Sequence, residues 1–455
     1  MSIETLIKKA FHNSFKIDPS EFSSDLAFGS IMEWDSLGHV GLMCELEKTI
    51  GIQIPNSQFP QLNSYENINN YFYKLHTNQN MVNKKIKTAN ATSAKIHHGL
   101  KEIYYDTSEI CLIDIEQGLY YRGYHINELV SSYSFEETAY LLLAGKFPSP
   151  QKLQDIHTII RRNFKVDEDI IFLDKNIKNI NIINLFKFFI SMQENKYENL
   201  DDYIENVFAL LGKLAAILIF KKNKLEGKEN LIPLEPLETI SYNLAAAFYP
   251  SNIEQAEIFF RKDLIIHAEH ESNASTFTGR ITASTKASVS NALTAAIDTF
   301  SGDLHGGALN KIDEQLDILK GLPCNSIDKY IRTKWDKKEL IYGFGHRVYV
   351  GEDPRSVIYK NILCDLKENG IFDNSLEIAK NLEAAVKKVC KKGFNPNVDL
   401  YCSVSYRSLA INREFHVPLF IISRLIGWLA HIWEQNNNLT IIRPRLCYVG
   451  NQPSL

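Results

Sequence analysis

The sequence predicts an all-α protein of two helical modules joined by a flexible linker, and three observations point to this arrangement. Apolar residues recur at helical spacing in the first module, in ETLIKKAF, SLGHVGLMCELEKTI and SYENINNYFYKLH. In the second module one helical pattern follows another, without the alternation of strands and helices that builds a dinucleotide-binding sheet. The segment between them has too few large apolar side chains to offset the entropy lost on ordering.

These patterns divide the chain into residues 1–78, 79–96 and 97–455. The first range is predicted to be a small helical bundle, the second a linker, and the third a larger and mostly helical module that starts with a short hairpin. The hairpin is predicted from the two extended runs of EICLIDIEQGLYYRGY, which flank residues 116–118. As a flexible coil, roughly twenty residues have an r.m.s. end-to-end distance of about 25 Å, so the modules can touch without being fixed together.

The first long helix of the larger module is marked at both ends. Ser134 and Glu137 form a capping box ahead of TAYLLLAG. Gly145 and Pro148 then end the helical pattern.

Composition excludes several classes of protein. With 45% hydrophobic and 23% charged residues, the chain is neither disordered nor fibrous. Its seven cysteines include no CxxC pair, which argues against a zinc site and a disulfide framework and favours a reducing compartment. No metal is predicted.

Charge and hydropathy argue against nucleic acid and membrane partners. The first eighty residues hold nine acidic and five basic side chains, while the rest hold 45 of each, so the excess negative charge lies in the first module and would repel phosphates. The N-terminus lacks the apolar core of a secretory signal. The longest apolar helix is predicted at Val207 to Phe220, which is too short for a bilayer and contains Lys213. We therefore expect a cytoplasmic protein.

Ser36 stands out in EWDSLGHV because it lies just before a helical pattern. A serine at or next to a helix N-cap exposes its hydroxyl, and a phosphate attached there faces the positive end of the helix. The local pattern alone favours a plain capping serine. However, DSL within an acidic helical module of about this size, followed by Glu45 and Glu47, resembles the acyl carrier protein family over residues 1–78. The resemblance implies that a phosphopantetheinyl transferase attaches 4′-phosphopantetheine to Ser36, and that the thiol of this arm carries acyl thioesters.

Four segments of the larger module bring together residues suited to acid–base and carboxylate chemistry, and arginines follow them. They are HAEHESNASTF with His267 and His270, SGDLHGGAL with His305, GFGHRVYVGEDPR with His346 and Arg355, NPNVDLY with Asp399, then Arg424, Arg443 and Arg445. Taken singly, each residue has an ordinary structural explanation. The histidines are also possible metal ligands, but they lack a compact HxxH…E spacing.

In order and together, these segments resemble the citrate synthase family, including the 2-methylcitrate synthases, from about Leu100 to Gly450. LYYRGY, HAEHESNASTF, LHGGA, GFGHRVY, DPR, NVD and IRPR all occur in family order. The resemblance implies a large and a small helical domain that close over the substrates, and a homodimer.

The resemblance also implies roles for single residues. Asp399 removes a proton from the carbon beside the thioester carbonyl, and His305 donates to the thioester oxygen. His346 polarises the keto group of the acceptor. The acceptor's carboxylates are bound by His270, Arg355, Arg424 and, from the neighbouring subunit, Arg443.

These roles agree with elementary chemistry. A carbon acid beside a thioester is so weak that an aspartate deprotonates it only while a donor stabilises the developing oxyanion. A dianionic acceptor needs several guanidinium groups, which bind carboxylates bidentately. Three positions depart from the family pattern: Asp303, where a proline is usual, and Ser405 with Arg407, where small and apolar residues are typical. They raise a question about the acyl-donor pocket.

The sequence therefore predicts a Claisen-type condensation of an acyl thioester with a 2-oxo acid such as oxaloacetate, giving a citrate-like product. The donor is acyl-CoA or an acyl group on the enzyme's own Ser36 arm. Tethering of the carrier gives an effective concentration in the millimolar range. Two alternatives remain: a lyase that runs the reverse reaction with the same residues, and a non-catalytic module that docks the carrier to an assembly line.

Overall fold

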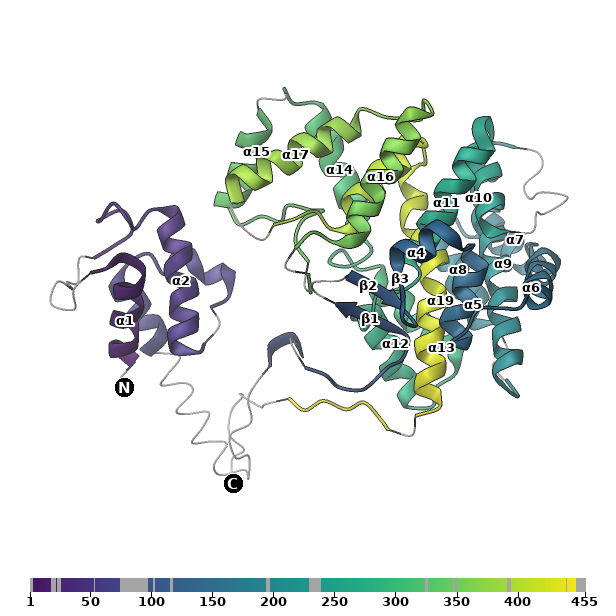
Figure 1. The fold of residues 1–455 in the computed structure, drawn as a ribbon, viewed down its shortest axis with the longest axis horizontal. Coiled ribbons are helices and arrows are strands. Elements are labelled where there is room, and N and C mark those ends of the chain that lie inside the picture. Colours follow the sequence, from purple (N-terminus) through teal and green to yellow (C-terminus); the bar gives the residue numbers. More distant parts are fainter. Residues whose placement is uncertain are drawn as a thin grey trace. The chain divides into compact units, whose positions relative to one another are not determined.

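A computed structural model describes the chain from residue 3 to residue 446, apart from 18–21, 23–25, 53, 74–96, 101–102, 115–117, 194–196, 229–238, 324–325, 347, 350, 391–393 and 439. Contacts divide the chain into two compact units (Figure 1). Residues 1–104 with 445–455 form one unit, and residues 105–444 form the other. The predicted linker, 79–96, lies outside the described residues.

The described residues of the smaller unit are mostly helical. The unit contains α1 (Ile3–Phe15), α2 (Ser36–Ile50), a helix over residues 65–73, and the short 3₁₀ helices η2 (Asn56–Gln61) and η3 (His98–Leu100). Its core centres on the fully buried Trp34, whose ring centroid lies 5.1 Å from that of Phe11. Gly38 is required near the start of α2, because a Cβ atom there would lie 1.9 Å from the carbonyl oxygen of Glu33. The helices expected from the first 78 residues are thus present.

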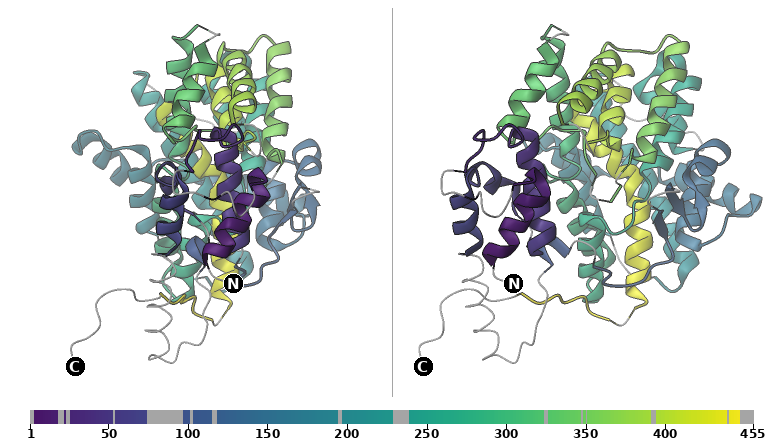
Figure 2. Two further views of the ribbon diagram at one scale, coloured as in Figure 1. Left: turned by 90° about the vertical axis from the view of Figure 1, so that its left-hand side faces the viewer. Right: turned by 60° about the vertical axis from the view of Figure 1, so that its left-hand side comes forward.

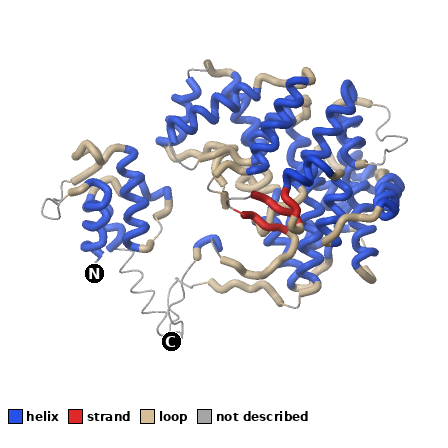
Figure 3. Tube along the Cα trace, in the orientation of Figure 1, coloured by secondary structure: helices blue, strands red, loops and turns tan. Residues whose placement is uncertain are grey.

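The larger unit begins with the predicted hairpin. Strands β1 (Cys111–Asp114), β2 (Gly118–Tyr121) and β3 (Tyr124–His125) form one antiparallel sheet in that order, drawn red in Figure 3. The hydroxyl of Tyr121 lies 3.1 Å from the carbonyl oxygen of Ile265 and 2.9 Å from that of Glu269. The sheet is therefore hydrogen-bonded to the HAEH segment, residues 267–270, where a helix ends at His267.

The helices of this unit form two groups. One comprises α4 (Ile126–Ser132), α5 (Phe135–Ala144), α6 (Pro150–Asn163), α7 (Glu168–Asn176), α8 (Ile182–Ser191), α9 (Leu200–Leu225), α10 (Ile240–Phe248), η4 (Pro250–Asn252), α11 (Ile253–His267), α12 (Ala274–Ser284), α13 (Val289–Phe300), η6 (Arg413–Phe415) and α19 (His416–Asn436). The other comprises α14 (Ala308–Lys320), α15 (Ile327–Asp336), α16 (Pro354–Glu368), α17 (Ser375–Cys390) and α18 (Val398–Ser408). The helix α19 runs through the first group and packs on α5, α9, α11, α12 and α13 (Figure 2).

The local signals before and after α5 are confirmed. Ser134 and Glu137 form the capping box, each side chain bonding the backbone of the other residue. Gly145 ends the helix in the left-handed conformation, with φ of 75°. Both ends of this helix were therefore predicted correctly from the sequence.

The apolar helix predicted at Val207 to Phe220 is longer than expected. It is α9, with 26 residues, and it passes a length and hydropathy test for a membrane span, as does the segment Arg413–Asn436. The share of the apolar window buried inside the protein is 72% for the first and 100% for the second. We interpret both as core helices, because protein already covers their apolar faces.

The departures at Ser405 and Arg407 are used within the fold. The Ser405 hydroxyl donates to the carbonyl oxygen of Tyr401, 2.8 Å away. Arg407 donates to Asp313 and Asp317 of α14, both at 2.8 Å. The Ser405 bond lies within α18, whereas the Arg407 contacts hold the C-terminal end of α18 against α14. Asp399 lies at the other end of α18.

The described cysteines contain no disulfide. Cys44, Cys111, Cys364, Cys390 and Cys402 all carry free thiols. Cys324 and Cys447 lie outside the described residues.

Candidate active site

Two distant segments pair to bring His346 close to the start of α18. The amide of Gly345 donates to the carbonyl oxygen of Asn395 at 2.9 Å, and the amide of Asn397 donates to that of Gly343 at 3.0 Å. Gly343 adopts φ of 85°, and a Cβ atom there would lie 2.9 Å from the Leu400 side chain. Glycine at this position thus permits both the turn and the close approach.

Asp353 joins this pair to Arg355, which was predicted to bind the acceptor. Its carboxylate receives hydrogen bonds from Nε of Arg355 at 3.0 Å and from Nη2 at 2.8 Å. It also accepts from the amide of Val398, the first residue of α18, at 3.2 Å. Asp353 is only 1% exposed, and despite this burial the neighbouring Arg355 holds the pKa of its carboxyl below the usual value.

His346 presents a defined donor. Its Nδ1 accepts from the amides of Val348 at 3.1 Å and Tyr349 at 3.2 Å, so the proton of the neutral ring is on Nε2. Burial, with a contribution from Arg355, lowers the pKa of His346 to about 4. The ring is therefore neutral at physiological pH and can donate from Nε2.

His305 lies against a polar group from the start of α12 and from α19. Its Nε2 is 2.9 Å from Oγ of Ser275 and 3.3 Å from Oδ1 of Asn273. Nε1 of Trp428 donates to the same Ser275 oxygen at 3.1 Å. Burial lowers the pKa of His305 to about 4, so this ring is neutral as well.

The two glycines after His305 permit close packing in the turn before α14. A Cβ atom on Gly306 would lie 2.2 Å from the ring of Phe300. A Cβ atom on Gly307 would lie 2.8 Å from the carbonyl oxygen of Gly302. The glycines thus close the turn against α13 and fix His305 in place.

Asp399 lies in the first turn of α18 with its carboxylate available. Asn397 caps the helix by accepting from the Asp399 amide at 3.1 Å. No hydrogen bond to the Asp399 carboxylate comes from the described residues. Burial raises the pKa of Asp399 to about 6, although Arg355 and Arg424 oppose this shift. An ionised carboxylate with free lone pairs and a raised pKa is suited to act as a general base.

His270 and Arg424 complete the group near Arg355. The ring centroids of His270 and His346 are 5.2 Å apart. Burial holds the pKa of His270 well below its usual value, with Arg355 contributing. Arg424 is 2% exposed and donates from Nε to the carbonyl oxygen of His267 at 2.6 Å. Burial lowers the pKa of Arg424, and Arg355 lowers it further, so two guanidinium groups lie within electrostatic reach of each other.

Arg443 lies in a non-helical segment after α19, and Ser36 lies in the smaller unit. Arg443 is exposed in the non-helical segment 440–446, and its role in a neighbouring subunit stays a prediction. Ser36 is the first residue of α2, as expected for a serine next to an N-cap, and its side chain lies outside the described residues. The capping oxygen comes from Asp35, which accepts from the Gly38 amide at 2.8 Å.

Sequence reasoning missed Asp353, Asn273, Ser275, Trp428 and Tyr349. Two of them carried a local signal, because Asp353 precedes Pro354 and Asn273 precedes a helical pattern, as N-cap residues do. The other three carried no such signal, because the contacts that bring them to the site, Trp428 with Ser275 and Tyr349 with His270, join segments far apart in the sequence.

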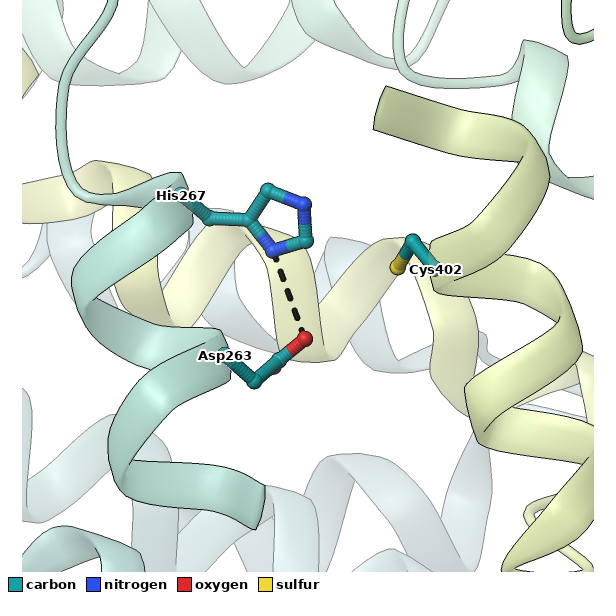
Figure 4. Close-up of side chains that lie close together, drawn as sticks. All are labelled: Asp263, His267 and Cys402. Carbon is teal, nitrogen blue, oxygen red and sulfur yellow. Dashed lines mark ion pairs between the residues drawn. The ribbon is translucent and has the colours of Figure 1, made fainter. Parts of the chain in front are cut away.

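A second buried group, shown in Figure 4, has the composition of a metal site. Donor atoms of Asp263, His267 and Cys402 lie within 4.8 Å of one another. Both carboxylate oxygens of Asp263 already accept hydrogen bonds, one from the hydroxyl of Tyr359 and one from that of Tyr406. A metal would have to displace these donors, so the group fits a hydrogen-bonded joint between α11, α16 and α18 better than a metal centre.

Comparison with known proteins identifies the family. The sequence profile described as "Citrate synthase, C-terminal domain" matches residues 99–445. Citrate synthase 2 of Bacillus subtilis is 34% identical over 366 residues, which is 77% of this chain and 95% of that protein. The chain belongs to the citrate synthase family.

Further citrate synthase relatives agree. The 2-methylcitrate synthase 2 of Corynebacterium glutamicum is 30% identical, covering 80% of this chain and 97% of that protein. The crystal structure of citrate synthase from Thermotoga maritima superposes with a TM-score of 0.71 at 30% identity, covering 79% of this chain and 97% of that one. Citrate synthase of Thermoplasma acidophilum, solved with carboxymethyl coenzyme A and oxaloacetate, has a TM-score of 0.71 at 25% identity, covering 80% of this chain and 98% of that one.

The chain is thus an enzyme of the citrate synthase type, which condenses an acyl thioester with a 2-oxo acid to give a citrate-like product. The mostly helical fold predicted for the larger module is confirmed by these superpositions. CoA thioesters are substrates of this citrate synthase reaction.

The acid limb of the pH–rate profile of this citrate synthase should follow Asp399. A general base must be ionised, so kcat/KM should fall about tenfold per pH unit below about pH 6 and be level above it. His305 and His346, with pKa values of about 4, should not titrate in this window. Initial rates from about pH 4.5 to pH 8 measure the profile. A profile that stays level to pH 5 would contradict the assignment.

Proposed function

We propose that Asp399, His305 and His346 carry out the condensation, and that the acceptor is a 2-oxo dicarboxylic acid of the oxaloacetate type. The observation that carries this proposal is that the same two arginines act electrostatically on all three residues: Arg355 and Arg424 on Asp399, whose pKa is about 6, Arg355 on the neutral His346, and Arg424 on the neutral His305. The base and the donors are in the protonation states that enolisation requires at neutral pH.

The reaction begins at the acyl donor. Asp399 takes a proton from the carbon beside the thioester carbonyl, and the electron pair moves onto the thioester oxygen. His305 stabilises this oxygen by donating from Nδ1, which requires that its Nε2 accept from the Ser275 hydroxyl. In the structure this hydroxyl donates to Oδ1 of Asn273 at 2.7 Å, so it has to turn toward His305, whose Nε2 is 2.9 Å away. Because the carbon acid is weak, removal of the proton and stabilisation of the oxyanion have to occur in one step.

The second step forms the carbon–carbon bond. The enol carbon attacks the keto carbon of the acceptor, whose oxygen becomes an alkoxide and takes a proton from His346. Nε2 carries that proton, because two backbone amides occupy Nδ1. The product is a citryl-type thioester, and water then cleaves it to the free acid and thiol, or it stays bound to the thiol carrier.

The acceptor's carboxylates are matched by cationic groups. Asp353 occupies one edge of the Arg355 guanidinium and leaves Nη1 for a ligand. Only Nε of Arg424 has a described hydrogen-bond partner, so its terminal nitrogens complement a second carboxylate. We further propose a cytoplasmic homodimer in which Arg443 of each chain completes the other chain's site.

For residues 1–78 we propose an acyl carrier protein with 4′-phosphopantetheine on Ser36, loaded by a phosphopantetheinyl transferase. Ser36 opens α2, and Asp35 already supplies the cap of that helix. A phosphate on this serine would face the positive end of the helix dipole. The arm would deliver an acyl group to the synthase or retain its product.

Removing the base or the oxyanion donor should stop the chemistry and spare acceptor binding. Asp399→Asn and His305→Ala should each reduce condensation at least about a hundredfold with little change in affinity for oxaloacetate. Exchange of the donor's α-hydrogens with deuterated solvent, with an unreactive acceptor analogue bound, should fall in parallel. His346→Ala should lose condensation but keep more of the exchange. Wild-type exchange in Asp399→Asn would exclude Asp399 as the base.

Ser36→Ala should abolish attachment of the arm. Intact-protein mass spectrometry, after incubation with CoA and a phosphopantetheinyl transferase, should show one added phosphopantetheine per wild-type chain and none on the variant. Ser30→Ala is a matched control on the same unit and should be modified normally. Phosphopantetheine attached to the Ser36→Ala variant would contradict the assignment of Ser36 as the attachment site.

A further inference from the structure

We propose that the hydroxyl of Tyr349 donates a hydrogen bond directly to the 2-oxo acid, at the position where its carboxylate and keto oxygens adjoin. This inference rests on the proposed function of the site. It adds a neutral donor that binds the acceptor alongside the arginines and histidines already described.

The position of Tyr349 motivates the proposal. Its side chain is 6% exposed, and its hydroxyl lies 3.3 Å from Nε2 of His270. Its ring centroid lies 4.6 Å from that of His346 and 5.6 Å from that of His270. Tyr349 therefore contacts both the histidine proposed to bind a carboxylate and the histidine proposed to bind the keto oxygen.

The shape of a 2-oxo acid explains why a donor is useful at this place. Its carboxylate and keto group are on adjacent carbons, so the groups that bind them must be neighbours. The Tyr349 hydroxyl lies beside Nε2 of His270, and the Tyr349 ring packs against that of His346, so a 2-oxo acid bound by these two histidines lies next to the hydroxyl. The hydroxyl can donate to such a ligand while it accepts from Nε2 of His270, and a ligand that lacks the matching acceptor loses this hydrogen bond.

The hydroxyl keeps its proton in this environment. Burial raises the pKa of Tyr349 above its usual value, and the positive charge of Arg355 only partly opposes this. Tyr349 is thus a neutral donor beside the cationic Arg355. The backbone supports the same geometry, because the Tyr349 amide donates to Nδ1 of His346. One residue therefore fixes the tautomer of His346 through its amide and offers its hydroxyl to the ligand.

Tyr349→Phe tests the proposal because it removes only the hydroxyl. The dissociation constant of oxaloacetate, measured by calorimetry without an acyl donor, should rise about tenfold or more, as expected for a hydrogen bond to a charged group. The KM of acetyl-CoA should stay unchanged. Tyr203→Phe is the matched control, since Tyr203 is fully buried and its hydroxyl donates to the carbonyl oxygen of Leu429 at 2.8 Å, outside the site. This control should bind oxaloacetate as the wild type does.

A second variant separates direct contact from positioning of His270. Adding Tyr349→Phe to His270→Asn should weaken oxaloacetate binding further, because a direct bond to the ligand does not need the imidazole. Equal affinities of the double variant and His270→Asn would overturn direct contact, as would unchanged binding in Tyr349→Phe alone. If the wild type binds oxaloacetate but forms no product, the proposed function fails, and the binding comparison still decides the role of Tyr349.

Discussion

The buried carboxylate of Asp353 is the contact on which the geometry of the active site depends. It holds Arg355 through two hydrogen bonds, receives the first amide of α18, and lies 4.0 Å from Nε2 of His346. Arg355, His346 and the helix that carries Asp399 therefore meet at one side chain. Because removing one partner of a buried ion pair typically costs about 3–5 kcal/mol, this junction is strongly held. The catalytic groups are positioned by a residue that takes no part in the proton transfers.

Much of the fold was predictable from the sequence, and the candidate catalytic residues were also predicted from it, for two different reasons. Apolar spacing, the Ser134 and Glu137 capping box, and the paired extended runs predicted the helices and the hairpin because these signals act within a few residues. The catalytic residues came from family resemblance, which preserves the order of the motifs. The resemblance gave no physical reason why these residues lie close together in the fold. That reason lies in contacts such as Asp353 with Val398 and Gly345 with Asn395, which join segments 45 and 50 residues apart. Local patterns contain no information about such contacts.

The differences between prediction and structure follow the same logic. The helix that contains Lys213 is longer than predicted, and the ammonium group of Lys213 pairs with Asp167 and lies 5.7 Å from the ring centroid of Phe189. Its charge is thus compensated while its stem covers apolar surface. Arg407 is explained by Asp313 and Asp317 rather than by a substrate. In each case an ion pair with a residue far away in the sequence explains a charged side chain that is unusual at its position.

The most direct test of this account is Asp353→Asn, which keeps the shape of the side chain and removes its charge. If the carboxylate coordinates the whole site, the variant should lose at least about tenfold in oxaloacetate affinity, and α-hydrogen exchange of a saturating acyl donor should fall by a similar factor. The two effects should appear together because Arg355 and the start of α18 are bound by the same group. Weaker oxaloacetate binding with exchange at the wild-type rate would show that the base is positioned independently of Asp353, and would contradict the account.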